Sequence, residues 1–136
     1  MTGTNHENRR MPVFSGDGRR KLFRVATLLV AVVLAWLAFR PSTGMDAGLP
    51  WDKANHAASF VVLTVLTGCG WPGVGAGRMA LIMLAAGTGI ELVQGLPAVG
   101  RDADVWDVVA DMAGAATGWA ALTIGGLRRR LGGPGT

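Results

Sequence analysis

The chain contains few of the residues that give a soluble or secreted domain its surface and its cross-links. Its 136 residues include no tyrosine and a single cysteine, and only 16% of them are charged. One cysteine, Cys69, excludes an internal disulfide and a Cys-x-x-Cys site. Half of the residues are hydrophobic and the mean hydropathy is +0.36, a composition typical of an integral membrane protein.

The net charge of +4 does not indicate a nucleic-acid partner, because the basic residues gather at the two ends of the chain. They are Arg9, Arg10, Arg19, Arg20, Lys21 and Arg24 at the front, and Arg128, Arg129 and Arg130 at the back. Such clusters orient membrane proteins more often than they bind nucleic acid. The sequence has no nucleotide-binding, zinc-finger or nucleophile-elbow motif, and we assign it no metal site and no cofactor.

Four hydrophobic segments predict the fold. They cover residues 22–39, 54–70, 79–96 and 105–127, each close to the ~20 residues that cross a hydrocarbon core of about 30 Å. We therefore expect an all-α membrane protein, a bundle of four transmembrane helices forming one domain over residues 22–127. Residues 1–21 are expected to form a disordered basic tail, and residues 128–136 a second basic tail.

The distribution of lysine and arginine predicts the orientation of the bundle. With both termini in the cytoplasm, ten basic residues lie inside and only three, Arg40, Lys53 and Arg101, lie outside. This asymmetry follows the positive-inside rule. Four tryptophans, at positions 36, 51, 71 and 106, fall near predicted helix ends, as in an aromatic belt, whereas Trp119 is expected to pack inside.

Most of the polar and ionisable side chains in the middle of the chain lie near the ends of these predicted helices. They are Asp52, Lys53 and His56 at the start of the second, Glu91 and Gln94 in the third, and Arg101, Asp104, Asp107 and Asp111 leading into the fourth. Ionisable groups are costly in lipid and by default indicate function. In the predicted topology all of these residues lie at the outer side of the membrane, so we expect one polar pocket in the outer leaflet.

Helical spacing places these residues on common faces. Asp104, Asp107, Asp111, Gly114 and Gly118 form one stripe, and Gly87, Glu91 and Gln94 form another. Gly114-x-x-x-Gly118 predicts close approach of a neighbouring helix. At ~1.5 Å per residue, counted from Pro97 and Val105, Glu91 and Asp111 are expected at equal depth, roughly 8–9 Å below the surface.

The pocket is expected to be acidic and to be lined by His56, Glu91, Arg101, Asp107 and Asp111. With His56 neutral, the six acids Asp52, Glu91, Asp102, Asp104, Asp107 and Asp111 and the two bases Lys53 and Arg101 leave four negative charges. Partly buried carboxylates repel one another, so either Glu91 or Asp111 is expected to hold a proton. The two carboxyls would then share one proton.

The candidate catalytic residues are His56, Glu91, Asp107 and Asp111. His56 suits acid–base chemistry, although a metal ligand and a hydrogen-bonded packing residue remain alternatives. Asp107 is also suited to the first turn of a helix, and Asp104 to an N-cap. The candidate substrate-binding residues are Lys53, Asp52, Gln94 and Arg101. Lys53 and Arg101 either hold an anionic group or neutralise the acids.

From Asp46 to Leu127 the chain resembles the VanZ-like family of small bacterial membrane proteins. The resemblance rests on Asp52-Lys53-x-x-His56-x-x-x-Phe60, on Glu91-x-x-Gln94, and on Arg101-x-x-Asp104-x-x-Asp107-x-x-x-Asp111-x-x-Gly114-x-x-x-Gly118. The family commonly has Asn where this chain has Asp111. The resemblance implies a multi-pass protein of the bacterial cytoplasmic membrane with a role in the cell envelope, linked through the family's name to teicoplanin-type resistance.

The expected function is binding of, or action on, a cell-envelope or lipid-linked molecule at the outer leaflet, with membrane lipids as surroundings and no nucleic acid. Whether the protein is an enzyme stays open, as does its oligomeric state. One alternative is a non-enzymatic assembly partner whose polar layer only connects the helices. The other is a proton- or cation-coupled transporter that uses Glu91 and Asp111.

Overall fold

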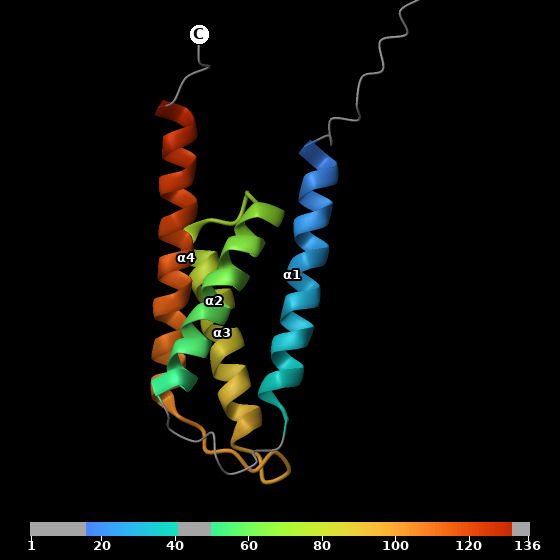
Figure 1. Ribbon diagram of the computed structural model, residues 1–136, viewed down its shortest axis with the longest axis vertical. Helices are drawn as coiled ribbons and strands as arrows, with labels where there is room; N and C mark the ends of the chain where they lie inside the picture. Colours follow the sequence, from blue (N-terminus) through green and yellow to red (C-terminus); the bar gives the residue numbers. More distant parts are fainter. Residues whose placement is uncertain (1–15, 41–49, 132–136) are drawn as a thin grey trace, which may run out of the picture.

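The computed structural model describes residues 16–40 and 50–131, with side chains for 16–40 and 52–126, and these residues form four helices and no strand. The helices are α1 (Gly16–Ala38), α2 (Pro50–Gly70), α3 (Ala76–Gln94) and α4 (Val105–Leu131). They run alternately up and down, so the start of α1 and the end of α4 lie at the same end of the molecule (Figure 1). The all-helical prediction is confirmed.

The bounds of all four helices differ from the prediction, and α2 begins at Pro50 instead of residue 54. Residues 16–21, expected in a disordered tail, form the first turns of α1. Asp17 in the first turn suits the positive end of the helix dipole, and no proline interrupts the helix. Residues 128–131, expected in the second tail, extend α4. Residues 1–15, 41–49 and 132–136 lie outside the described residues, and with them Arg9, Arg10 and Asp46.

The third helix ends at Gln94, two residues earlier than predicted. The N–H of Gly95 donates to Glu91 O and that of Leu96 to Val93 O, which ends the helix in a tighter turn. Pro97 follows directly and cannot continue a helix. The helix also begins at Ala76, three residues before the predicted start, so its 19 residues are displaced toward the N-terminus of the chain.

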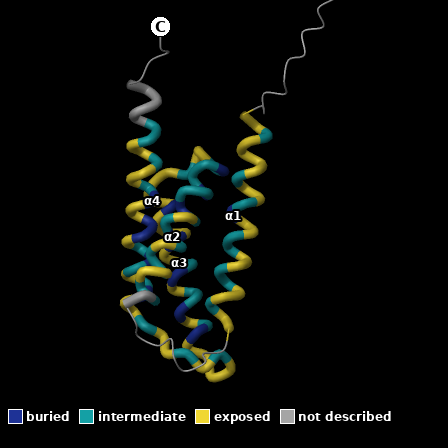
Figure 2. Tube along the Cα trace, in the orientation of Figure 1, coloured by how far each residue is buried: buried dark blue, intermediate teal, exposed yellow. Residues whose placement is uncertain are grey.

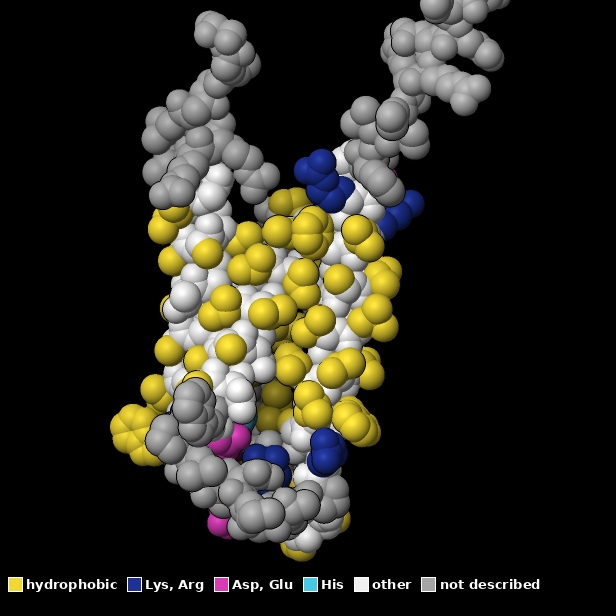
Figure 3. Space-filling model, viewed as in Figure 1, with side chains coloured by type: hydrophobic (Ala, Val, Ile, Leu, Met, Phe, Trp, Pro, Cys, Tyr) yellow, Lys and Arg dark blue, Asp and Glu magenta, His cyan; other side chains and the backbone are white. Residues whose placement is uncertain are grey.

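Three helices, α1, α3 and α4, are long and apolar enough to cross a membrane. The remaining helix, α2, has 21 residues and is long enough, but it carries Asp52, Lys53 and His56 in its first two turns. Apolar side chains cover the flanks of the bundle, and basic side chains appear at both ends (Figure 3). This distribution is typical of a membrane-embedded bundle.

The most extensive contact in the bundle joins α2 to α4. A Cβ atom added to Gly114 would collide with the carbonyl group of Ala57, and one added to Gly118 would lie 2.8 Å from Val61 O. The two backbones therefore touch along the Gly-x-x-x-Gly stripe, as predicted. Without a hydrophobic driving force between helices in lipid, such close backbone packing is a main source of helix association.

A small apolar core lies under this contact and extends to α3. It contains Phe60, Met79, Met83 and Ala115, and Trp119 packs against it, as predicted. The buried residues of α3 follow one face of the helix, and Figure 2 shows the buried positions of the bundle turned toward its interior. The helices α2, α3 and α4 thus form the compact part of the molecule.

The first helix is attached mainly to α2 and hardly touches α3. At one end, Arg24 Nε donates to Gly70 O at 2.9 Å, and the guanidinium lies 5.4 Å from the centre of the Trp71 ring. At the other end, Gln94 Nε2 donates to Ala38 O at 3.2 Å. A cavity lined by Leu34, Leu37 and Ala38 separates part of α1 from α2 and α3.

Candidate functional site

The candidate polar residues meet at the end of the bundle opposite the termini. They come from the start of α2, the end of α3, the segment 95–104 and the start of α4, and acidic and basic side chains appear together at this end in Figure 3. The structure divides them into two groups. One group connects helices to each other, and the other faces a cavity beside α1.

The connecting group begins with the N-terminus of α4. Asp104 Oδ1 accepts the N–H of Trp106 at 2.9 Å, so Asp104 is the N-cap of α4, as predicted. Glu91 Oε2, from α3, accepts the N–H of Asp104 itself at 2.8 Å. In a capping box the residue three positions after the cap would make that second bond. Here Glu91 of α3 accepts this second bond, and the contact fixes α3 to the start of α4.

Lys53 joins α2 to the same place. Its Nζ lies 2.6 Å from Asp104 Oδ2 and 2.8 Å from Asp107 Oδ1. The bond from Lys53, with the N–H of Trp106, holds the pKa of Asp104 below its ordinary value of 3.8. Lys53 is therefore occupied by two carboxylates, which favours the neutralising role over the predicted contact with a substrate anion.

The carboxyl group of Asp111 holds the ring of His56. His56 Nδ1 lies 3.0 Å from Asp111 Oδ1, and the side chain of Asp111 is completely buried. Space for Asp111 comes from Gly87 on α3, where an added Cβ would lie 2.6 Å from Asp111 Oδ2. When Asp111 is ionised and the His56 ring is neutral, Nδ1–H donates to the carboxylate and Nε2 keeps its lone pair.

The contacts of Glu91 and Asp111 correct their expected depth. Glu91 reaches the backbone of Asp104, whereas Asp111 lies against Gly87, one helical turn before Glu91 along α3. Asp111 is therefore the deeper of the two. The prediction of equal depth was wrong because it counted from Pro97, whereas α3 ends at Gln94.

Buried oxygen atoms without hydrogen-bond partners remain in this region. Among the described residues these are Glu91 Oε1, Asp111 Oδ2 and, further along α2, Thr64 Oγ1. A buried polar atom without a partner costs about 1–3 kcal/mol. Two of the three buried atoms without a hydrogen-bond partner in the described interior are therefore carboxyl oxygens of this region.

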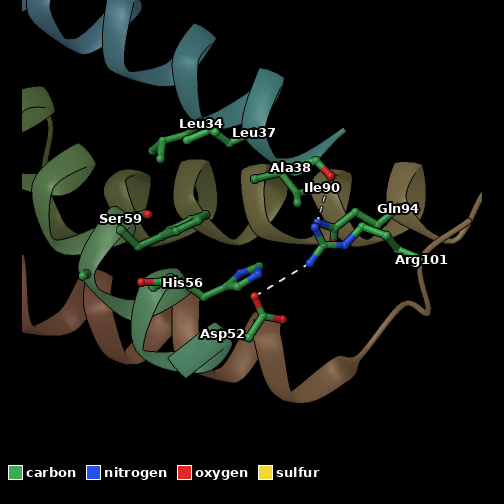
Figure 4. A pocket seen from close by; sticks show the side chains of 12 residues that line it. Leu34, Leu37, Ala38, Asp52, His56, Ser59, Ile90, Gln94 and Arg101 are labelled. Atoms are coloured by element: carbon green, nitrogen blue, oxygen red, sulfur yellow. Dashed lines mark hydrogen bonds and ion pairs between the residues drawn. The ribbon is translucent and has the colours of Figure 1, made fainter. Parts of the chain in front are cut away.

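The second group of polar residues lines a cavity of about 490 Å³ between α1, α2 and α3. Its polar wall contains Asp52, Asn55, His56, Ser59, Gln94 and Arg101. Its apolar wall contains Leu34, Leu37 and Ala38 of α1 together with Ala58, Phe60 and Ile90. Figure 4 shows His56 and Asp52 of α2 on one side, Gln94 and Arg101 on another, and the two leucines of α1 across from them.

Within the cavity the charged groups are only loosely paired. Arg101 Nη2 lies 3.7 Å from Asp52 Oδ1, too far for a hydrogen bond, and both side chains are partly exposed. Asp52 and Arg101 also neutralise each other, so the cavity carries no large excess charge when His56 is neutral. The four negative charges expected for one pocket are instead divided between the cavity and the buried layer behind it.

The predicted site residues therefore separate into two sets. His56, Asp52, Gln94 and Arg101 line the cavity, whereas Lys53, Glu91, Asp107 and Asp111 do not. The expectation that Glu91, Asp107 and Asp111 line the same cavity was wrong. Glu91 accepts the N–H of Asp104, Asp107 binds Lys53, and Asp111 lies behind the His56 ring. Asp111 contacts the cavity only through His56.

Sequence reasoning missed the wall that α1 contributes. Leu34, Leu37 and Ala38 lie in a uniformly apolar helix, and nothing in their spacing distinguishes them from residues that face lipid. Asn55 and Ser59 are four residues apart on α2, and this spacing is the one signal that would have placed both beside His56 on the cavity.

One set of side chains has the arrangement of metal ligands. Atoms of Asp52, His56 and Asp107 all lie within 4.8 Å of one another.

Comparison with protein-family models, with curated proteins and with solved structures finds no match for this chain. Its function is therefore argued from the site.

Proposed function

We propose that all four helices cross the membrane, with both ends of the chain in the cytoplasm. The charges of the described residues support this orientation. Arg19, Arg20, Lys21, Arg24 and Arg78 lie at the end that carries the termini, and only Arg40, Lys53 and Arg101 lie at the other. The polar start of α2 then lies at the outer surface, where its charges reach water and lipid headgroups.

On this topology the protein binds an amphiphilic molecule of the cell envelope in the outer leaflet. The observation that carries the proposal is the cavity, in which His56, Asp52 and Gln94 lie across from the apolar side chains of α1 (Figure 4). Ligand cavities of about 300–1,000 Å³ that are mostly apolar, with a few polar groups, are typical of small-molecule sites. The cavity of about 490 Å³ holds a head group and the first part of an attached chain.

The head group is anionic, and Arg101 is its anchor. Lys53 is bound to Asp104 and Asp107, so Arg101 is the one cation that lines the cavity among the described residues. Its contact with Asp52, at 3.7 Å, is weak enough to be exchanged for a phosphate or carboxylate. Gln94, Asn55 and Ser59 offer further hydrogen bonds.

His56 is the residue positioned for chemistry on such a molecule. Asp111 orients its ring, and its other nitrogen is available near the cavity. A histidine held this way serves as a general acid or base when a reacting group comes within hydrogen-bond distance. From the sequence resemblance between Asp52 and Gly118 we also propose that the chain is a VanZ-like protein of a bacterial cytoplasmic membrane, with teicoplanin-type resistance as a consequence of envelope binding.

A second candidate function is supported by the connecting group. Lys53, Asp104 and Glu91 join three helices through short bonds that need no ligand. An assembly partner without catalytic activity would keep this network and have no need of the cavity. Loss of function on changing His56 to alanine, at normal membrane levels and unchanged thermal stability, favours the first candidate.

Binding is tested with the purified full-length chain in nanodiscs, with dodecyl phosphate as the probe and dodecyl maltoside as the neutral comparison. Arg101→Ala should weaken dodecyl phosphate binding about tenfold or more, as expected for loss of a charged hydrogen bond. Arg78→Ala, at the opposite end of the bundle, is the matched control and should bind normally. Equal binding by the two variants would contradict the proposed site.

The orientation is tested separately with reporter fusions. Fusions after Arg40 and near Val99 should be external, and fusions after Gly75 and Thr136 should be internal. An external reporter at Thr136 would place the cavity in the cytoplasmic leaflet and contradict the proposal of an outer-leaflet ligand.

A further inference from the structure

Two polar atoms face each other across a gap beside the cavity. His56 Nε2 lies 3.9 Å from Asp107 Oδ2, beyond hydrogen-bond distance. The other polar atom of each side chain is already engaged, His56 Nδ1 by Asp111 and Asp107 Oδ1 by Lys53. The side chain of Asp107 is 8% exposed, so the carboxylate lies in a largely buried environment.

The surroundings of His56 are those of a metal-binding histidine. Such a histidine donates its other ring N–H to a carboxylate or carbonyl, which fixes the tautomer and directs the free nitrogen to the ion. Asp111, completely buried, has this position toward Nδ1. Lys53 has a similar relation to Asp107, because it binds Oδ1 and leaves Oδ2 directed at the gap.

A third ligand comes from the same helix as His56. Asp52 lies four residues before His56, on the same face of α2, and its carboxylate is within 4.8 Å of the other two ligand atoms. Its contact with Arg101, at 3.7 Å, is loose, so the carboxylate can turn toward the gap. Asp52 and His56 line the cavity, which leaves the open side of the site facing it.

We propose that Asp52, His56 and Asp107 bind one divalent transition-metal ion, Zn²⁺ or Mn²⁺. One imidazole and two carboxylates suit these ions, and bonds of about 2.0–2.2 Å place neighbouring ligand atoms roughly 3–4 Å apart. The 3.9 Å gap fits that spacing. The ion also offsets the negative charge of Asp52 and Asp107, of which Asp107 is largely buried.

This proposal goes beyond amphiphile binding, which does not require a metal. It also replaces the acid–base role proposed above for His56, because Nε2 binds the ion instead. From the sequence, a metal ligand was one of the alternatives for His56, although no metal site was assigned. The open coordination positions on the cavity side suit an oxygen atom of a bound head group. Lys53 and Arg101 stay outside the set of ligands.

The test uses the full-length protein in nanodiscs, treated with a chelator and then titrated with Mn²⁺ or Zn²⁺ alone. We expect one ion bound per chain, measured by electron paramagnetic resonance for Mn²⁺ and by competition with a chromogenic chelator for Zn²⁺. The Mn²⁺ spectrum should show coupling to an imidazole nitrogen. That coupling should disappear in His56→Ala.

Three variants sharpen the result. Asp111→Asn should weaken binding about 10–100-fold, the usual effect of changing the partner of a metal-bound histidine. Asp52→Asn should weaken it at least as much, and it leaves the helix-connecting network intact, so the variant should fold normally. Asp102→Asn, an exposed acid in the same region, is the matched control and should bind like the parent.

The proposal is overturned by equal metal binding in Asp52→Asn and Asp102→Asn, by an Mn²⁺ spectrum without nitrogen coupling, or by fewer than one ion per two chains for both metals. Dodecyl phosphate binding is measured on the same preparations without metal. Loss of metal binding with retained dodecyl phosphate binding rejects the ion site alone, and the reverse outcome rejects the proposed amphiphile site alone.

Discussion

The two neighbours of α2 meet it in different ways. On one face, α4 approaches until backbone touches backbone, because Gly114 and Gly118 have no side chains to keep it away. On another face, α1 is joined to α2 through Arg24, whose side chain donates to Gly70 O, and a cavity lies between α1, α2 and α3. The same helix thus has one interface built for packing and one that leaves space for a ligand.

The difference explains why the polar residues divide as they do. Behind the tight interface, Lys53, Asp104 and Glu91 find partners in the protein. Beside the loose interface, Asp52 and Arg101 have only a weak mutual contact. Stability should therefore depend on the α4 side, and ligand binding on the α1 side.

The largest loss of stability is expected from closing the space at Gly114. Gly114→Ala places a Cβ against the carbonyl of Ala57, and neither backbone can move without separating the helices. Overpacking should lower the free energy of unfolding by about 1–3 kcal/mol. Thermal unfolding in a fixed detergent measures it, with Gly89→Ala as control, because nothing lies within 4 Å of that position. An unchanged Gly114→Ala would contradict the tight interface.

A comparable or slightly smaller loss is expected at Glu91. Glu91→Ala removes the acceptor of the Asp104 N–H and should cost about 1 kcal/mol, since a partly buried donor loses its partner. Glu91→Gln keeps an acceptor oxygen and should recover most of this stability. If Gln is as damaging as Ala, the negative charge at Glu91 is needed and the purely connecting role is wrong.

A smaller effect, seen mainly in acid, is expected at Lys53. The pKa of Asp104 is held below 3.8, so the stabilisation it contributes is present above the unfolded pKa and is lost as the pH falls through the lowered folded pKa. Lys53→Ala should shift acid unfolding to higher pH. Far-ultraviolet circular dichroism across pH 2–7 measures the midpoint, and Lys21→Ala, on the exposed start of α1, should leave it unchanged.

The smallest effect on stability is expected on the cavity side. Leu34→Ala removes side-chain atoms that face a cavity, so the free energy of unfolding should change by no more than about 0.5 kcal/mol. Unfolding in the same detergent tests this. A loss as large as that of Gly114→Ala would mean that α1 packs as tightly as α4, and the contrast between the two interfaces would fail.

Much of the fold followed from the sequence because its signals are local. Apolar segments of membrane-spanning length, Pro41 and Pro97 beyond two helix ends, and the Gly114-x-x-x-Gly118 stripe each depend on a few neighbouring residues. The start of α1 was missed because Arg19 to Lys21 are polar and carry no periodic apolar signal, although nothing there breaks a helix.

The site was predicted less completely because its partners come from distant parts of the chain. Helical spacing placed Asp104, Asp107 and Asp111 on one face, but it could not show that Lys53 occupies Asp107. Nor could it show that Glu91 caps a backbone N–H, because that bond depends on where α3 ends. The apolar wall of α1 has no sequence signal, since lipid and a ligand chain require the same side chains.

The most direct test of the account is to fill the cavity without touching its polar wall. Leu34→Trp places a large ring in the space beside His56, and Leu29→Trp, at an exposed position of the same helix, is the matched control. Both variants should reach the membrane and unfold at the parent's temperature. The account predicts that Leu34→Trp alone loses dodecyl phosphate binding, whereas equal binding by both variants would contradict a ligand site between α1 and α2.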